Sequence, residues 1–447
     1  MIEDDFGTRL ERGPGPGLWT LTAPKWSLSR PVVAGGRVYV SVDGWITALD
    51  RETGEQVWRS PYRCSTSRSQ PLTVASSCVV VQGPEGVAVA VLETESGSEL
   101  RRIDVRNHIG HVSDGRTVVV AHAPDGRMFT GYDVRGGDPL WSWPDPIAWG
   151  AIASVRGMEV MDGRLVLYGG EDNEYRNTPR SFVVRGYDLR TGSLLWRRPF
   201  PNAKILSPPR ASEAQQRLVF VWCPDTLCLT WLSAADGEEV GRLTYPSMSE
   251  YARPRLFDDE RTLWITKSGG RSVYRFRAFE PEEPRVTYRL VEELSVYDLS
   301  LAVAGGWLYA TTNDGMLAAA RADRNRWPRR VRHRVRVRGT LRWRMAEGHE
   351  RLVAGGDYVY ARAWDRRGWA SVVALRHGQE LWRRRHCSPV EPLPCDDRVL
   401  LMESDKCAVP DDPYKEWLTG RRGCARPHDQ DRLLMVDAET GATTGSP

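Results

Sequence analysis

Short runs of apolar and β-branched residues alternate along the chain with glycine-rich turns, and helical periodicity is absent. Residues 33–40 read as a short strand, a Gly35-Gly36 turn and a second strand. Similar stretches return at 303–310 and, with one residue inserted, at 353–360. Each second strand is rich in β-branched or aromatic residues, which suit a half-buried pleated surface. The pattern therefore predicts repeated β-hairpins and an all-β fold.

A second signature follows the hairpins: an Asp-x-x-Thr-Gly turn that leads into a tryptophan. It is fullest at 50–58, returns at 188–196, is varied at 133–141 and is shortened at 377–382. Asp accepts hydrogen bonds from nearby amides, glycine supplies a positive φ, and the tryptophan offers a large face to bury. We predict that tryptophans pack between repeat units at Trp19, Trp58, Trp141, Trp196 and Trp382.

The spacing of the second strands gives the number of units. Their predicted starts lie 39–53 residues apart, at Arg37, Cys78, Thr117, Arg164, Arg217, Thr262, Trp307, Tyr358 and Arg398. This spacing suits one four-stranded propeller blade per period. It gives nine units, whereas the usual range of four to eight blades favours eight. We therefore predict an all-β, closed β-propeller of four-stranded blades. The usual range makes eight blades the expected number, and the strand spacing allows up to nine.

The last unit ends without its tryptophan strand. The segment 18–21, which contains Trp19, has the character of that missing strand. Pairing the two chain ends would remove exposed sheet edges, so we predict that the N-terminal strand closes the ring. The predicted organisation is an N-terminal segment, 1–30, that includes this closing strand, followed by a propeller over 31–447.

Composition sets expectations about partners and location. The formal net charge is only +4, which argues against nucleic acid as a partner. No uninterrupted apolar stretch is long enough to span a bilayer, so no membrane insertion is expected. Residues 1–10 carry three acidic residues and no apolar segment typical of a secretory signal. We therefore expect a cytoplasmic protein whose eight cysteines are reduced thiols.

Arginines alternate with other residues between 329 and 338. On a strand, Val331, His333, Val335 and Val337 would share one face and a ladder of arginines the other. The ladder consists of Arg330, Arg332, Arg334, Arg336 and Arg338. It is a candidate site for an acidic protein partner, because guanidinium groups bind carboxylates well. The alternative is a solvated rim strand whose charges discourage edge pairing.

The last unit is rich in cysteine, and Cys395, Cys407, Cys424 and His428 form a weak zinc candidate. Their spacing fits no Cys-x-x-Cys knuckle, so structural thiols are favoured and no metal is predicted. Cys223 and Cys228 flank a tight turn and are interpreted as packing residues that face each other across a hairpin. His108 and His111 lie near the start of the third unit, where a loop role is expected. Neither a Gly-x-Ser-x-Gly motif nor a phosphate-binding glycine loop occurs.

Over roughly residues 31–447 these motifs resemble the PQQ-like propeller repeat, of the quinoprotein or BamB type. The fullest copy combines 36–40 with 48–58. The resemblance implies either a quinoprotein dehydrogenase or a non-catalytic propeller. The alcohol dehydrogenases of that family carry an adjacent Cys-Cys disulfide and a calcium ion bound by carboxylates. This chain has no Cys-Cys pair, and its richest acidic run, 171–174, reads as a solvated loop.

The expected function is a non-catalytic, WD40-like scaffold, without a cofactor, that mediates protein–protein interaction in a bacterial cytosolic assembly. The alternative is a quinone (PQQ)-dependent dehydrogenase or a propeller that binds a small ligand. Fold does not decide between these functions.

Overall fold

A computed structural model supplies the coordinates of the protein. The structure describes the following residues: 2–3, 8–13, 17–24, 28–64, 72–83, 87–105, 107–122, 128–144, 158–170, 181–201, 204–206, 217–223, 226, 228–244, 255–258, 262–266, 272–277, 286–289, 300–311, 317–321, 334–335, 352–364, 370–377, 379–385, 392–403 and 430–443. In these ranges the chain forms 38 β-strands. They assemble into sheets that we call blades and number in chain order.

The first six blades each consist of four consecutive strands. Blade 1 comprises β4 (Val32–Ala34), β5 (Arg37–Val42), β6 (Trp45–Asp50) and β7 (Gln56–Arg63). Blade 2 comprises β8 (Leu72–Ala75), β9 (Cys78–Gln82), β10 (Ala88–Glu93) and β11 (Glu99–Asp104). Blade 3 comprises β12 (His108–Ser113), β13 (Thr117–His122), β14 (Met128–Asp133) and β15 (Pro139–Pro144). Blade 4 comprises β16 (Met158–Met161), β17 (Arg164–Gly170), β18 (Ser181–Asp188) and β19 (Leu194–Pro201). Blade 5 comprises β20 (Lys204–Leu206), β21 (Leu218–Cys223), β22 (Cys228–Ser233) and β23 (Glu239–Thr244). Blade 6 comprises β24 (Arg255–Asp258), β25 (Thr262–Thr266), β26 (Ser272–Arg277) and β27 (Val286–Arg289).

The remaining blades include the chain ends. Blade 7 comprises β28 (Ser300–Ala304), β29 (Trp307–Thr311), β30 (Leu317–Arg321) and β31 (Arg334–Val335). Blade 8 comprises β32 (Leu352–Gly355), β33 (Tyr358–Trp364), β34 (Ala370–Arg376) and β35 (Gln379–Arg385). Blade 9 comprises β36 (Leu393–Cys395), β37 (Arg398–Glu403), β38 (Gln430–Asp437), β3 (Trp19–Pro24), β2 (Arg9–Arg12) and β1 (Ile2–Glu3).

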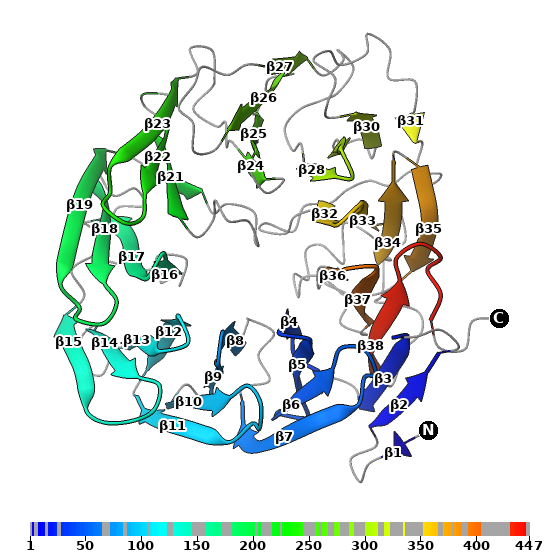
Figure 1. The fold of residues 1–447 in the computed structure, drawn as a ribbon, viewed down its shortest axis with the longest axis horizontal. Helices are drawn as coiled ribbons and strands as arrows, with labels where there is room; N and C mark the ends of the chain where they lie inside the picture. The colour runs from blue at the N-terminus through cyan, green and yellow to red at the C-terminus, as the bar shows by residue number, and fades with distance from the viewer. Residues whose placement is uncertain are drawn as a thin grey trace, which may run out of the picture. The chain divides into compact units, whose positions relative to one another are not determined.

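The blades fall into two compact units: blades 2–6 form one, and blades 7–9 with nearly all of blade 1 form the other. Within each unit, the first strands of successive blades contact one another, as β8, β12 and β16 do in one unit and β28, β32 and β36 in the other (Figure 1). Antiparallel four-stranded sheets that pack side by side in this way are the blades of a β-propeller. The predicted all-β propeller of four-stranded blades is confirmed.

The number of blades corrects one prediction. The described residues form nine sheets, so the preference for eight blades was one too few. Eight of the nine predicted second strands begin at the predicted residue, and the other begins at Leu218 instead of Arg217. The spacing was the better guide because each period holds a full set of strands. No helix among the residues that the structure describes is both long and apolar enough to cross a membrane.

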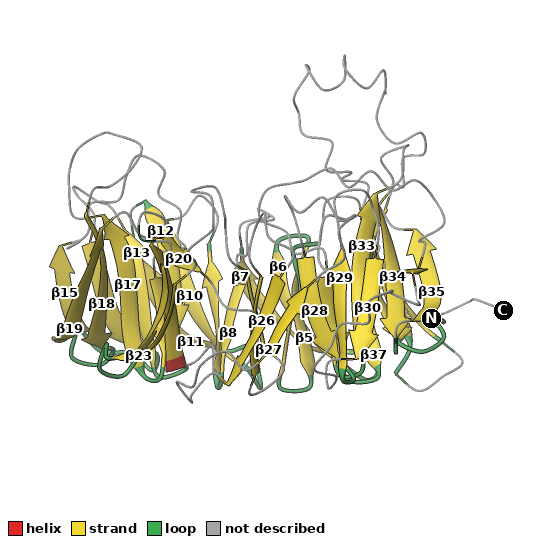
Figure 2. Ribbon diagram, turned by 90° about the horizontal axis from the view of Figure 1, so that it is seen from above, coloured by secondary structure: helices red, strands yellow, loops and turns green. Residues whose placement is uncertain are grey.

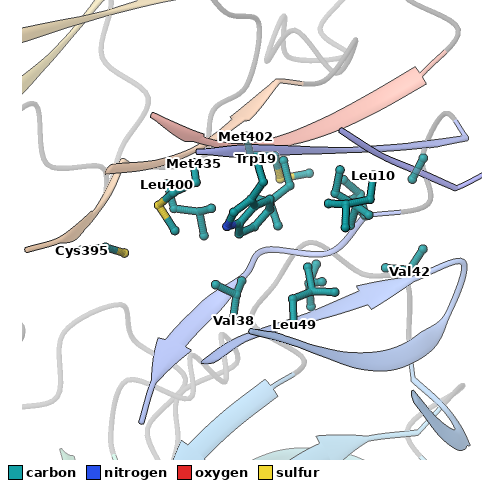
Figure 3. Close-up of a cluster of buried hydrophobic side chains, with 14 residues drawn as sticks. Leu10, Trp19, Val38, Val42, Leu49, Cys395, Leu400, Met402 and Met435 are labelled. Carbon is teal, nitrogen blue, oxygen red and sulfur yellow. The ribbon is translucent and has the colours of Figure 1, made fainter. Parts of the chain in front are cut away.

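The two chain ends pair within blade 9. Strand β3 runs antiparallel to β38 over six residue pairs, from Trp19 opposite Met435 to Pro24 opposite Gln430. The predicted pairing of the N-terminal strand with the last unit is confirmed. Trp19 is fully buried there among apolar side chains of blade 9 and of blade 1, including Met402, Leu10 and Leu49 (Figure 3).

In five blades, a backbone hydrogen bond joins the turn after the first strand to the turn after the third strand. In blade 1 the Asp50 carboxylate accepts hydrogen bonds from the amides of Glu52 (2.9 Å) and Thr53 (2.7 Å), and Gly54 takes a φ of 71°. The Arg51 amide then donates to the carbonyl of Gly36, which lies in the turn between the first two strands. Equivalent bonds recur in blades 2, 3, 5 and 9. Both turns therefore lie at the same end of a blade (Figure 2) and hold each other in place.

Tryptophans of the fourth blade strand dock on the turn of the next blade. The Nε1 atom of Trp141 donates to the Leu189 carbonyl (3.1 Å), and that of Trp196 to the Ala234 carbonyl (3.1 Å). Trp382 and Trp19 make the same bond, 2.9 Å long, to the carbonyls of Ala438 and Arg51. Trp58 is buried on β7, where its ring centroid lies 5.9 Å from that of Tyr39. Each bond satisfies the indole N–H while the ring covers apolar surface.

Candidate functional site

Blade 3 carries a group of imidazoles on its first two strands. His108 and His111 lie on β12, and His122 ends β13 directly opposite His108. Residues three apart on a regular strand point to opposite faces. The β12–β13 pairing is shifted between His108 and Gly110, which leaves Ile109 as an extra residue in β12. Such a β-bulge restores the two histidines to one face.

The two imidazoles on β12 meet directly. His108 Nε2 lies 3.1 Å from His111 Nδ1, and the ring centroids are 5.2 Å apart. His111 is buried, and His108 is half-buried. Among the described residues, His108 Nδ1 has no hydrogen-bond partner. A buried ring nitrogen without a partner is uncommon and calls for an explanation.

A short chain of polar groups continues from His122. His122 Nε2 lies 3.0 Å from Thr130 Oγ1, which lies 3.0 Å from Ser142 Oγ. Thr130 is opposite Val120 and Ser142 on the neighbouring strands, and His111 is opposite Val120. Directly paired residues share a face of a sheet. The three histidines and two hydroxyls therefore lie on one face of blade 3, the face whose Val118 and Val120 pack against blade 2.

Burial keeps these rings neutral. It lowers the pKa of His111 to about 3, with a further contribution from His108, and the pKa of His108 to about 4, with one from His122. Burial also lowers the pKa of His122. Protonation would place a cation in a largely apolar seam between two blades, which is unfavourable. At neutral pH each ring therefore offers a lone pair, for a hydrogen bond or for a metal ion.

The expectation of a loop role for His108 and His111 was wrong, because both lie on a strand. The sequence shows two histidines three residues apart, which on a regular strand would diverge. Only the bulge at Ile109 brings them together.

The arginine ladder lies almost entirely outside the described residues. Only Arg334, with Val335, is placed: they form β31, where Arg334 is opposite Ala318 of β30. Arg330, Arg332, Arg336 and Arg338 are outside the described ranges.

Of the four residues in the weak zinc candidate, only Cys395 is described, and Cys407, Cys424 and His428 lie outside the described residues. Cys395 is 5% exposed in the apolar cluster around Trp19. Burial, ahead of all other effects, raises its pKa to about 11. Cys223 and Cys228, in contrast, lie directly opposite each other at the end of the β21–β22 hairpin, and both side chains are buried.

Exposed aliphatic side chains lie at a second type of β-bulge, on the fourth strands of blades 3 and 4. In blade 4, Gly186 is opposite Trp196 and Tyr187 is opposite Leu194, so Leu195 is the extra residue. The same shift occurs in blade 3, where Leu140 is the extra residue. Leu140 and Leu195 are 40% and 46% exposed. In blades 3 and 4, the residue before the repeat tryptophan therefore presents an apolar side chain to solvent.

Comparisons with known proteins now bear on this architecture. A family model described as outer membrane protein assembly factor BamB, a PQQ-like repeat family, matches residues 8–81, 42–176 and 180–444. The chain belongs to this family. This BamB-type chain is 27% identical over 285 residues to the outer membrane protein assembly factor BamB of Burkholderia pseudomallei (strain K96243). The aligned region covers 59% of this chain and 68% of that protein.

Two further proteins are similar to this chain, one in sequence over part of its length and one in fold. Quinoprotein glucose dehydrogenase A of Acinetobacter calcoaceticus is 26% identical over 168 residues, or 37% of this chain and 21% of that protein. The crystal structure of a eukaryotic initiation factor superposes with a TM-score of 0.50 at 10% identity, covering 86% of this chain and 89% of the other. This second similarity concerns the fold alone.

Proposed function

We propose that this BamB-type propeller is a non-catalytic scaffold that binds other proteins in a bacterial cytoplasmic assembly. The observation that carries the proposal is the similarity over 59% of the chain to a protein named as an assembly factor. The geometry supports it as well. Tryptophans docked on the turns of the next blade and linked turns make the blades rigid, and rigid blades hold their connecting segments in fixed positions for binding.

Two features supply binding chemistry. Leu140, Leu194 and Leu195 are 40–52% exposed on the fourth strands of blades 3 and 4, and protein interfaces use such apolar groups in their buried centre. The arginine ladder at 330–338 is the proposed contact for an acidic partner, because guanidinium groups bind carboxylates through paired hydrogen bonds.

A PQQ-dependent dehydrogenase is the second candidate, favoured by the similarity to quinoprotein glucose dehydrogenase A. The calcium ion of such enzymes requires several oxygen ligands. In the part of the chain that the structure describes, no three His, Cys, Asp or Glu side chains converge on one point, so no residue there is assigned to calcium or PQQ.

Capture from native lysate tests the scaffold. The tagged full chain is compared with a variant that carries Arg332→Glu, Arg334→Glu and Arg336→Glu. A second variant makes the same charge change at the exposed Arg116, Arg135 and Arg190, which lie in turns. We expect the wild type and the turn variant to retain the same proteins and the ladder variant to lose them, with melting temperatures nearly equal. Equal capture by all three removes the ladder from the binding site.

The enzyme candidate has its own test. PQQ and calcium are added to the purified chain, and cofactor absorbance and dye-linked alcohol or glucose oxidation are measured. We expect neither a retained cofactor spectrum nor turnover. Turnover that depends on both additions would replace the scaffold with the dehydrogenase.

A further inference from the structure

We propose that Cys223 and Cys228 in blade 5 form a redox-sensitive dithiol, which closes to a cross-strand disulfide in the presence of a low-molecular-weight disulfide such as oxidised glutathione. This proposal does not depend on the scaffold function. It assigns a covalent modification site to the β21–β22 hairpin, in which the packing role expected from the sequence belongs to the reduced state.

The register of the hairpin sets the distance between the two residues. Strands β21 and β22 pair without a shift as far as Cys223 opposite Cys228. At the other end of the two strands the Ala234 amide donates to the Arg217 carbonyl, so these two residues are a hydrogen-bonded pair. Such pairs recur at every second position of an antiparallel ladder, and Cys223 with Cys228 is six positions further along. The Cα atoms of a hydrogen-bonded pair are about 5.5 Å apart, which is the usual separation in disulfides.

The two side chains also share a face and a position at the end of their strands. Directly paired residues project from the same face of a sheet, so the two sulfur atoms stand on one side of the hairpin. Each cysteine is 8% exposed. Among the described cysteines, no other two lie opposite each other on neighbouring strands: Cys78 is opposite Ala75 and Glu93, and Cys395 is opposite Arg398. The geometry for a disulfide is therefore specific to blade 5 within the described residues.

Polar groups beside the pair suit the thiolate, which is the reactive form in disulfide exchange. Cys228 Sγ lies 3.7 Å from Thr230 Oγ1, and this hydroxyl can donate a hydrogen bond to a thiolate. Arg242 lies opposite Thr230 on the neighbouring strand. Its pKa is raised mainly by the hydrogen bond and charge of Glu239, and further by both cysteines, so the guanidinium is near the two sulfur atoms. Its positive charge offsets that of a transient thiolate.

The exchange takes place in two steps. The thiolate of one cysteine attacks a sulfur of oxidised glutathione, forms a mixed disulfide and releases one glutathione thiolate. The thiolate of the other cysteine attacks the protein sulfur of this mixed disulfide, forms the Cys223–Cys228 bond and releases the second glutathione thiolate. The two protein thiols lose two protons and two electrons. The electrons reduce the glutathione disulfide, and the protons pass to the two glutathione thiolates.

Equilibration of the native full chain with mixtures of reduced and oxidised glutathione tests the proposal. After an acid quench, the remaining thiols are labelled with N-ethylmaleimide in urea. The tryptic peptide 218–242, which contains no other cysteine, is then analysed by mass spectrometry. The variants are Cys223→Ala, which keeps an apolar side chain in the cluster between blades 4 and 5, and Cys228→Ser. The matched control is Cys395→Ser, which removes a buried thiol that has no cysteine opposite it. Circular dichroism checks the fold.

We expect the wild-type peptide to lose both maleimide labels and two hydrogen atoms as oxidised glutathione increases, and reductant to restore both labels. Cys395→Ser should give the same result, whereas Cys223→Ala and Cys228→Ser should carry at most one glutathione on the remaining thiol. If a variant does not fold, the wild-type peptide alone decides the test. Two maleimide labels at every mixture, a wild-type peptide that carries glutathione instead of the internal disulfide, or a disulfide that forms only after urea is added would each overturn the proposal.

Discussion

Gly186 lies directly opposite Trp196 in blade 4, and a Cβ atom added to Gly186 would stand 2.2 Å from the indole ring. The same pair recurs in blade 3 as Gly131 and Trp141, and in blade 8 an alanine lies opposite Trp382. In blade 5 the pair is exchanged: Trp231 is on the third strand and Gly241 on the fourth. Each of these tryptophans is therefore paired with a small residue on the neighbouring strand.

This relationship makes Gly186 sensitive to side-chain size. We expect Gly186→Val to lower the free energy of unfolding by about 1–3 kcal/mol, because the indole must leave its position on the Ala234 turn to make room. Gly186→Ala should cost less, since blade 8 accommodates alanine opposite its tryptophan. Urea denaturation followed by tryptophan fluorescence measures both. An unchanged midpoint for the valine variant would show that the docked indole does not constrain this position.

Blade 2 has neither the tryptophan nor the small residue opposite it. Arg101 occupies the tryptophan position, and Val91, opposite it, occupies the position of the small residue. The Arg101 guanidinium lies 4.7 Å from the ring centroid of Tyr132 and donates to the carbonyls of Asp133 (2.9 Å) and Gly137 (2.7 Å). Arginine therefore docks on the turn of blade 3, as tryptophans do elsewhere.

The replacement of tryptophan by Arg101 in blade 2 predicts that substitutions at Arg101 and Val91 are energetically coupled. Arg101→Trp alone should destabilise the protein by about 1–3 kcal/mol, because Val91 leaves no room for an indole. Val91→Gly added to it should recover most of this loss, although Val91→Gly alone leaves a cavity. A double-mutant cycle in urea measures the coupling, with Arg135→Ala as an exposed arginine control. Strictly additive costs would mean that the two positions are independent.

The repeat was predictable because its residues perform the same local task in each unit. Asp50 and Gly54 form their turn through neighbouring amides and a positive φ, and such short-range chemistry is legible in a sequence. The start of β5 at Arg37 follows from the turn before it. The His108–His111 pair was not predictable, because it depends on a bulge that one extra residue creates between two strands. The exchanged pair at Trp231 and Gly241 was likewise hidden, since it is defined by pairing across strands.

Trp19 is expected to be critical for joining the chain ends. It is fully buried between blades 9 and 1, and its Nε1 donates to the Arg51 carbonyl. Trp19→Ala should therefore cost about 3–5 kcal/mol through the cavity that it leaves. Trp19→Phe keeps most of the apolar contact and loses the hydrogen bond, so its cost should be about 1–2 kcal/mol. Urea denaturation compares the two, and an alanine variant as stable as the phenylalanine variant would contradict this role.

Cys395 should be nearly inert towards thiol reagents in the folded protein. It lies in the apolar cluster around Trp19, and burial raises its pKa to about 11. Only about 0.1% of such a thiol is ionised at pH 8, compared with about a quarter of an unperturbed cysteine, and the thiolate is the reactive form. Iodoacetamide labelling at pH 8, read by peptide mass spectrometry, should leave Cys395 unmodified until urea is added. Rapid labelling of the native chain would show that the thiol is accessible, and would make Cys395 available again as a ligand in the last unit.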